Sequence, residues 1–314
     1  MTRVAAIDCG TNSIRLLVAD VDPSSGRLTD LTRQMRVVRL GQGVDRTGEF
    51  APEALARTFE ALDAYAATCR LLRVERTRFV ATSATRDARN RDDFLDGVLT
   101  RIGVAADVIS GDEEAALSFA GVTSSIADAP APYLVVDLGG GSTELALGDR
   151  ELAAAYSMDV GCVRLTERHL VSDPPTPDEQ AAAVADVRAA LDVAMATVPV
   201  AETRTLIGVA GSITSVTAHA LGLTHYDPVK IHGATLSVDR IIRSCNTLIA
   251  ATYAERKAMP FMHPGRVEAI GAGALVWREV VMAVAEAVAA SGGLLETVTT
   301  SEHDILDGIA LSLA

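Results

Sequence analysis

The sequence predicts an α/β protein made of two similar domains with a ligand site in an interdomain cleft. An apolar run that ends in Asp and continues into Gly and small polar residues occurs twice, at 4–21 and at 133–149. Between the copies, Asp128–Pro132 reads DAPAP, which is typical of an exposed domain boundary. Since one such hairpin heads each half, the pair indicates an internal duplication. The length of 314 residues also suits about two domains.

The second copy has the chemistry of a phosphate site. Its apolar run 133–136 predicts a buried strand, which Asp137 ends. The glycines 139–141 permit a tight turn and close approach to a ligand, and Glu144 adds a second carboxylate. Bare amides suit phosphate oxygens, and carboxylates suit a divalent cation.

Two better-known phosphate motifs are excluded. The segment is not a Walker loop, because no Lys follows the glycines. It is not the dinucleotide-binding fingerprint, because a strand rather than a helix follows the turn. A hairpin without a ligand remains the alternative for either copy alone. Because the first copy repeats the pattern, with Asp8 before Gly10, Thr11, Asn12 and Ser13, the pair favours phosphate binding.

The first half predicts a helix that begins at Pro52, since Pro fits the first helical position and the following apolar residues recur at helical spacing. Alternating and apolar runs predict the strands, and the turn DPSSGR at 22–27 separates the second from the third. The expected strands are 4–7, 14–21, 28–40, 78–82 and 104–109. The expected helices are 52–72, 86–102 and one that begins near Ser110.

The second half repeats this order. Pro and Asp at 174–178 open a long helix, and Gly211 and Ser212 lead from a strand into a helix that ends at Gly222. The strands expected after the hairpin are 151–156, 206–209 and 294–300. The expected helices are a short one near Arg164, then 178–198, 211–222, 238–253, 265–290 and 304–313.

The segment SGDEEAALSFAGV at 110–122 predicts a helix capped by Ser110 or Asp112. Glu113 and Glu114 fall in its first turn, where an acid favours the helix dipole by about 0.3–1 kcal/mol. The pattern alone favours this structural interpretation over a general base.

Composition excludes several classes of function. A net charge of −13 argues against nucleic-acid binding, and a polyanionic ligand would need local arginines and a metal. The four cysteines have no paired spacing, which argues against zinc or disulfides and favours a reducing compartment. We find no signal peptide and no membrane span, so we expect a cytoplasmic protein.

Six segments together resemble the exopolyphosphatase and guanosine pentaphosphate phosphohydrolase family, within the sugar kinase, Hsp70 and actin superfamily. They occur in family order over nearly the whole chain, and the short length is most similar to two-domain actinobacterial members. The segments are IDCGTNSIRLLV (7–18), TSATRDARN (82–90), ISGDEEAALSFAGV (109–122), VVDLGGGSTEL (135–145), MDVGCVRLTE (158–167) and GVAGSITS (208–215).

The resemblance implies two ribonuclease-H-like domains. Domain I would comprise 1–127 and about 303–314, and domain II 128–302. The last helix would therefore cross back and pack on the first domain.

The resemblance also implies the roles of individual residues. Glu114 would activate the attacking water, and Arg86 would bind a phosphate in bidentate fashion. Asp137 and Glu144, with Asp8 acting through water, would hold Mg²⁺, or else Mn²⁺ or another divalent cation. The residues expected to bind phosphate are Gly10, Thr11, Asn12, Ser13, Gly139, Gly140, Gly141, Ser142, Thr143, Gly211 and Ser212.

The implied activity is the release of orthophosphate from short polyphosphate. Some relatives place a lysine where this chain has Thr214, and the neutral residue argues against a tight hold on long chains. Guanosine pentaphosphate is the alternative substrate. An actin-like ATPase or sugar kinase and a non-catalytic polyphosphate-binding module are alternatives of other classes. The family also suggests a homodimer through a long second-domain helix, and Lys230, His232 and Arg266 have no assigned role.

Overall fold

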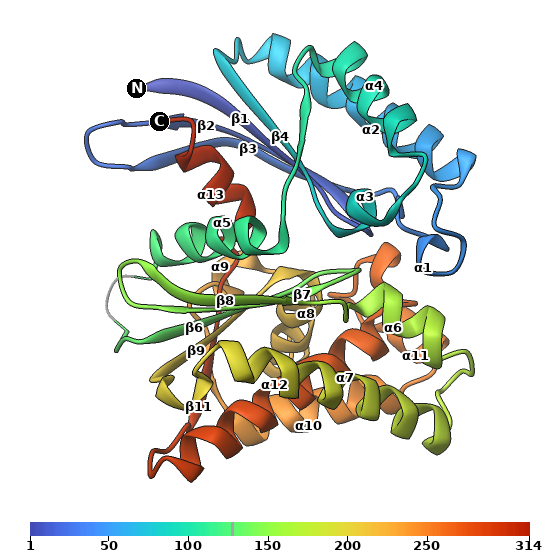
Figure 1. Cartoon of the computed structure of the whole chain (residues 1–314), viewed down its shortest axis with the longest axis vertical. Helices are drawn as coiled ribbons and strands as arrows, with labels where there is room; N and C mark the ends of the chain where they lie inside the picture. Colours follow the sequence, from blue (N-terminus) through green and yellow to red (C-terminus); the bar gives the residue numbers. More distant parts are fainter. Residues whose placement is uncertain (127–128) are drawn as a thin grey trace. The chain divides into compact units, whose positions relative to one another are not determined.

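The structure is a computed structural model that describes residues 1–126 and 129–314. The chain divides into two compact units (Figure 1). Unit 1 comprises Met1–Ser125 and Asp304–Ala314, and unit 2 comprises Ile126–His303. Of the expected linker, Asp128 lies outside the described residues.

Unit 1 is a five-stranded mixed sheet in the order β3-β2-β1-β4-β5. The first three strands are antiparallel neighbours, and β4 and β5 continue the sheet in parallel with β1. Its strands are β1 (Thr2–Cys9), β2 (Ser13–Val21), β3 (Leu28–Val37), β4 (Arg76–Ala81) and β5 (Ala106–Val108). Its helices are α1 (Val44–Thr47), α2 (Pro52–Leu71), α3 (Ser83–Asp87), α4 (Arg91–Ile102), α5 (Gly111–Thr123) and α13 (Ile305–Leu311).

Helices cover both faces of this sheet, α2 and α4 on one and α5 and α13 on the other (Figure 1). Successive side chains of a strand point to opposite faces, so β1 contributes Ala5 and Ile7 to one core and Val4 and Ala6 to the other. This arrangement explains why the strand reads as one continuous apolar run.

Unit 2 is a six-stranded mixed sheet in the order β10-β11-β9-β6-β7-β8. Its strands are β6 (Tyr133–Leu138), β7 (Thr143–Gly148), β8 (Leu152–Met158), β9 (Thr205–Val209), β10 (Thr235–Ser237) and β11 (Thr297–Thr300). Its helices are α6 (Cys162–His169), α7 (Pro177–Thr197), α8 (Ala210–Leu221), α9 (Pro228–Ile231), α10 (Val238–Ala250), α11 (Tyr253–Ala258) and α12 (Ile270–Ala290).

Both sheets begin with three antiparallel strands and add two parallel strands beside the first. In unit 2 the corresponding order is β8-β7-β6-β9-β11, extended at the edge by β10. This is the ribonuclease-H-like arrangement, so the predicted fold class of two such domains is confirmed.

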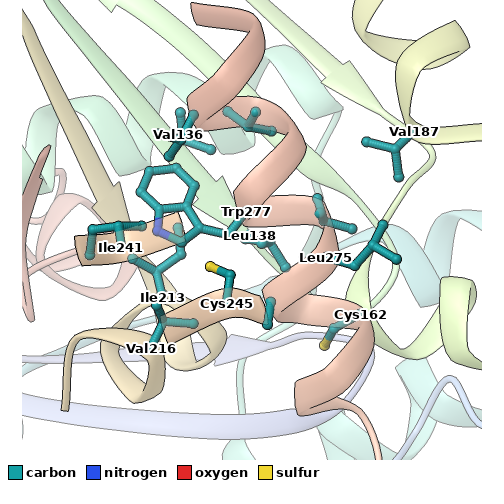
Figure 2. Close-up of a cluster of buried hydrophobic side chains, with 14 of the residues drawn as sticks. Val136, Leu138, Cys162, Val187, Ile213, Val216, Ile241, Cys245, Leu275 and Trp277 are labelled. Atoms are coloured by element: carbon teal, nitrogen blue, oxygen red, sulfur yellow. The ribbon is translucent and has the colours of Figure 1, made fainter. Parts of the chain in front are cut away.

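The largest fully buried side chain of unit 2 is Trp277 of α12. Figure 2 shows its indole among Val136 of β6, Ile213 of α8 and Ile241 of α10. A Cβ on Gly208 would lie 2.8 Å from the same ring, so the indole packs directly on the backbone of β9. This core fixes the start of α8 against the carboxyl end of β9.

Three helix predictions were wrong in detail. The predicted helix 86–102 is divided into α3 and α4, because the Asn90 side chain binds both the N–H (2.8 Å) and the carbonyl (3.1 Å) of Phe50. The predicted helix 238–253 ends at Ala250, and α11 starts separately behind a capping box of Thr252 and Glu255. The helix predicted from 265 begins only at 270, after a 3₁₀ turn.

Short elements without periodicity, namely α1, α9 and β10, were not predicted. Among the described residues, no helix is both long and apolar enough to cross a membrane.

Candidate active site

The glycine turn between β6 and β7 presents a row of backbone N–H groups. The carbonyl oxygens of 139–141 all accept hydrogen bonds from the start of α6. Because the C=O and N–H of a trans peptide point in opposite directions, the next three amides, those of 140–142, point away from α6. The bonds are Cys162 N to Gly139 O (3.0 Å), Val163 N and Arg164 N to Gly140 O (2.9 and 3.1 Å) and Arg164 Nε to Gly141 O (2.7 Å).

Three successive amides that point the same way form a concavity suited to an anion. The Gly139 amide is outside this set, because it donates to Ser142 O (3.0 Å) within the turn. The Thr143 hydroxyl is also committed, since it donates to the Val160 carbonyl (2.6 Å). The predicted phosphate-binding stretch 139–143 is therefore reduced to its central amides.

The turn between β1 and β2 repeats this construction in unit 1. Gly10 N donates to Ser13 O at 3.0 Å, the same distance as in the second turn. The carbonyls of Thr11 and Asn12 accept bonds from the loop 38–41, so the amides of Asn12 and Ser13 point away from that loop. The conserved geometry is what an internal duplication predicts.

Two carboxylates flank the second glycine turn. Asp137 on β6 and Glu144 on β7 are paired directly in the sheet register, so their side chains share one face. Their residues are 7% and 1% exposed. The Ser157 hydroxyl of β8 donates to Glu144 Oε1 (2.7 Å) and orients that group. Paired, buried carboxylates with hydroxyl support suit a divalent cation.

The equivalent position in unit 1 carries an ion pair. Asp8 lies directly opposite Arg15, whose Nη2 and Nε donate to Asp8 Oδ2 at 2.6 and 3.0 Å. Arg15 also binds Asp304, at the start of α13. Burial raises the pKa of the Asp8 carboxyl, and the guanidinium opposes that shift. Asp8 is thus present where predicted, with one oxygen held by Arg15.

The structure distinguishes the two first-turn glutamates of α5, which Ser110 caps through Glu113 N. Glu113 points outward to Arg78 (2.6 Å), with a side chain 46% exposed. Glu114 is buried and accepts a bond from Arg86 Nη1 (2.8 Å), which also donates to the Ile109 carbonyl. The segments 82–90 and 109–122 therefore meet at the Glu114–Arg86 pair.

The start of α8 is packed more tightly than the sequence suggested. Gly211 O accepts from Arg266 Nη1 (3.1 Å), and a Cβ at Gly211 would collide with the Arg266 guanidinium. Ser212 is 7% exposed. The neighbouring Thr214 contacts the Tyr226 hydroxyl (2.8 Å), whose pKa is raised to about 12 by burial and by the charge of Glu302.

The sequence places Gly161 in the segment 158–167, at the expected edge of the site, and the structure explains the glycine: a Cβ there would lie 2.5 Å from Gly140. Sequence reasoning missed other supporting residues. Ser157, Arg266 and Asp304 have no comparable signal in the sequence. Within the part of the chain that the structure describes, no group of three or more His, Cys, Asp or Glu side chains is arranged as a metal site. Asp137 and Glu144 belong to unit 2, and Asp8 belongs to unit 1.

Comparison with known proteins identifies the family. The chain matches the Ppx/GppA phosphatase family over residues 17–304. It belongs to this family. Exopolyphosphatase 2 of Mycobacterium tuberculosis is 50% identical over 321 aligned residues, which cover 100% of this chain and 99% of that protein. The resemblance deduced from the six segments is therefore confirmed.

Solved structures of Ppx/GppA proteins have the same fold. The crystal structure of an exopolyphosphatase-like protein has a TM-score of 0.96 at 45% identity and covers 99% of this chain and 98% of that one. The Aquifex aeolicus member of the Ppx/GppA family has a TM-score of 0.79 at 27% identity, with 99% and 97% coverage.

Proposed function

We propose that this protein is an exopolyphosphatase, which hydrolyses the terminal phosphoanhydride bond of inorganic polyphosphate and releases orthophosphate. The observation that carries the proposal is the 50% identity with Exopolyphosphatase 2 of M. tuberculosis over the whole chain. The amides of 140–142 and the Asp137–Glu144 pair are suited to a phosphate chain and its counter-cation.

Positioning and charge neutralisation are the main requirements of phosphoryl transfer. The outward-pointing amides of each turn would bind phosphate. Arg86 uses Nη1 for Glu114 and Ile109, so its Nη2 and Nε would contact the terminal phosphate in bidentate fashion. Gly211 and Ser212, at the start of α8, would bind a further phosphate.

Asp137 and Glu144 would hold Mg²⁺, or Mn²⁺ in its place, with Asp8 contributing through water. The fit rests on two buried carboxylates on one face, of which Ser157 orients one. A divalent cation there would neutralise charge on the scissile phosphate.

Glu114 would accept the proton of the attacking water, for in-line displacement of the polyphosphate chain. Of the adjacent residues Glu113 and Glu114, Glu114 is the buried one, and a hydrogen bond from Arg86 orients its carboxylate. Glu113 points to the surface ion pair with Arg78 and takes no part.

The proposed substrate is short-chain polyphosphate. Thr214 is neutral, and its hydroxyl is already engaged by Tyr226, so it offers no charge to a long polyanion. We further propose a cytoplasmic homodimer that associates through α7, which bears the exposed Val193 (55%) among exposed alanines.

The test is orthophosphate release with Mg²⁺ from tripolyphosphate, long-chain polyphosphate and guanosine pentaphosphate in parallel. We expect the highest kcat/KM on tripolyphosphate. Faster release from the nucleotide would replace the proposed substrate, and no release from any of the three would refute the proposed activity.

A further inference from the structure

The helix that the sequence predicts over 86–102 is interrupted at Ala88 in the structure. Ala88 is extended, with φ −82° and ψ 125°, so α3 ends at Asp87 and α4 begins at Arg91. Arg86 therefore lies in the last turn of the short helix α3. Because of this interruption, α3 does not have to follow the direction of α4.

The Asn90 side chain holds this break from outside the helix. Its Oδ1 accepts a hydrogen bond from the Phe50 N–H (2.8 Å), and its Nδ2 donates to the Phe50 carbonyl (3.1 Å). Asn90 occupies the N-cap position of α4, where asparagine favours a bond to a helix amide, yet no such bond occurs in the part of the chain that the structure describes. The amide group of Asn90 thus joins two segments instead of capping its own helix.

Phe50 is a fixed partner for these bonds. It is 3% exposed, and its ring packs edge-on against Phe94 of α4, with the ring centroids 5.7 Å apart. Phe94 in turn packs against Phe79 of β4, at 6.1 Å. The Arg89 N–H adds a bond to the Gly48 carbonyl (2.8 Å) of the same loop. The break is therefore held against the aromatic core of unit 1.

On the other side of the break, Arg86 contacts the segment that carries Glu114. Its Nη1 donates to the Ile109 carbonyl (3.0 Å) and to Glu114 Oε2 (2.8 Å). The helix α4 is fixed in the core by Phe94, which is 0% exposed. A helix continuous over 86–102 would have to follow α4, and the Arg86 guanidinium would lose its position.

We propose that Asn90 is a positioning residue for the reaction, which holds Arg86 beside Glu114 by keeping α3 and α4 from joining. This inference rests on the proposed function, in which Arg86 binds the terminal phosphate. Asn90→Ala removes both bonds to Phe50 and places the best helix former beside the break, so that helix is favoured through 88–90. Arg86 then moves away from Glu114, and its contact with phosphate weakens.

The experiment is a double-mutant cycle of Asn90→Ala and Arg86→Ala in the full chain. We measure kcat/KM for tripolyphosphate, the dissociation constant for pyrophosphate by isothermal titration, and Tm. For Asn90→Ala alone we expect kcat/KM and pyrophosphate affinity to fall about 10-fold or more, the equivalent of losing a hydrogen bond to a charged group. In the Arg86→Ala background the same change should alter either quantity by less than about 2-fold, because residues that act through one another are not additive. A purely structural role would lower Tm and both quantities equally in the two backgrounds.

Arg89→Lys is the matched control. The Arg89 guanidinium binds the same loop through the Thr47 carbonyl (2.9 Å) and the Glu49 carboxylate (3.2 Å), with a side chain 69% exposed. The substitution keeps the charge and leaves both Asn90 bonds in place. Since exposed ion pairs contribute little, kcat/KM and pyrophosphate affinity should stay within about 2-fold of wild type.

Asn90→Asp is the conservative variant. It keeps the acceptor for the Phe50 N–H and loses the donor to the Phe50 carbonyl, so its losses should fall between those of wild type and Asn90→Ala. If Asn90→Ala does not fold, Asn90→Asp takes its place in the cycle.

Equal losses in the two backgrounds, or wild-type kcat/KM and pyrophosphate affinity in the Asn90 variants, would overturn the proposal. The absence of measurable pyrophosphate binding to wild type would overturn it as well. A wild type that binds pyrophosphate but releases no orthophosphate would refute the proposed activity and leave the binding cycle as the test of Asn90.

Discussion

Asp137 pairs directly with Glu144 across β6 and β7, just as Asp8 pairs with Arg15 across β1 and β2. The duplicated hairpins therefore share an aspartate but differ at its partner. Unit 1 pairs its aspartate with an arginine of the same hairpin, whereas unit 2 places two buried carboxylates opposite each other on one face. Since like charges directly opposite each other are unfavourable, the second hairpin is the one at which we propose a divalent cation.

Glu144→Gln tests whether Glu144 is a ligand of the proposed cation, by a measurement that does not depend on enzymatic activity. Gln can still accept the Ser157 hydrogen bond, so the hairpin should fold as before. We expect Mg²⁺ to raise the Tm of wild type and to leave that of the variant unchanged, because ligand stabilisation follows binding to the folded state. Glu151→Gln makes the same charge change at an exposed position of unit 2 and should respond to Mg²⁺ as wild type does. An Mg²⁺ response retained in Glu144→Gln would exclude Glu144 as a ligand.

Glu114→Gln tests the general base. The amide keeps an oxygen for Arg86 but cannot take a proton, so kcat should fall by about 10²–10⁴-fold with little change in KM. Glu113→Gln alters the adjacent residue of the same helix turn and should turn over normally. Steady-state kinetics on tripolyphosphate distinguish the two. Comparable rates in both variants would assign the base to another residue.

The strands and hairpins were predictable because their signals are local. Two-sided burial makes β1 and β6 continuous apolar runs, and glycines mark the turns between paired strands. The break between α3 and α4 was not predictable, because it depends on hydrogen bonds between Asn90 and Phe50, 40 residues apart. The start of α11 was marked by Thr252 and Glu255, a capping-box signal that the apolar periodicity of 238–253 obscured.

Some features of the candidate site were likewise predictable from the sequence, and others were not. Asp137 and Glu144 could be paired from the sequence, because a hairpin fixes which residues face each other. The pattern EE at 113–114 could not say which glutamate is buried, since that depends on Arg78 and Arg86 from other elements. The Arg15–Asp304 contact has no sequence signal, because chain topology alone brings the two together.

Gly161→Ala tests whether the glycine turn between β6 and β7 binds phosphate, because Gly161 packs directly against that turn. The added methyl would lie 2.5 Å from Gly140 C and O, so the turn must shift and the row of amides must lose its alignment. We expect the dissociation constant for pyrophosphate to rise at least about 10-fold, the equivalent of about 1.4 kcal/mol. Isothermal titration provides the measurement.

Gly292→Ala is the control for that substitution. It lies in the same unit with φ +84° and open space around it, so alanine there strains the backbone without touching the turn. It should lower Tm and leave the pyrophosphate affinity intact. If Gly161→Ala binds pyrophosphate as wild type does, the amide row is not the phosphate site.

His219 gives unit 2 a specific dependence of stability on pH. Its Nδ1 is buried with no hydrogen-bond partner among the described residues, its ring packs edge-on to Phe261 at 6.2 Å, and burial lowers its pKa. The unfolded chain therefore takes up a proton as pH falls below about 6.5, where the folded protein does not, and this contribution to stability is present above that pH and lost below it. His219→Leu should thus gain stability relative to wild type between pH 7 and pH 5, by no more than about 1.4 kcal/mol per pH unit. Urea unfolding at several pH values measures the difference, with His225→Leu, at a side chain 70% exposed, as the control. Parallel curves for His219→Leu and wild type would mean that His219 takes up its proton equally in the folded and unfolded states.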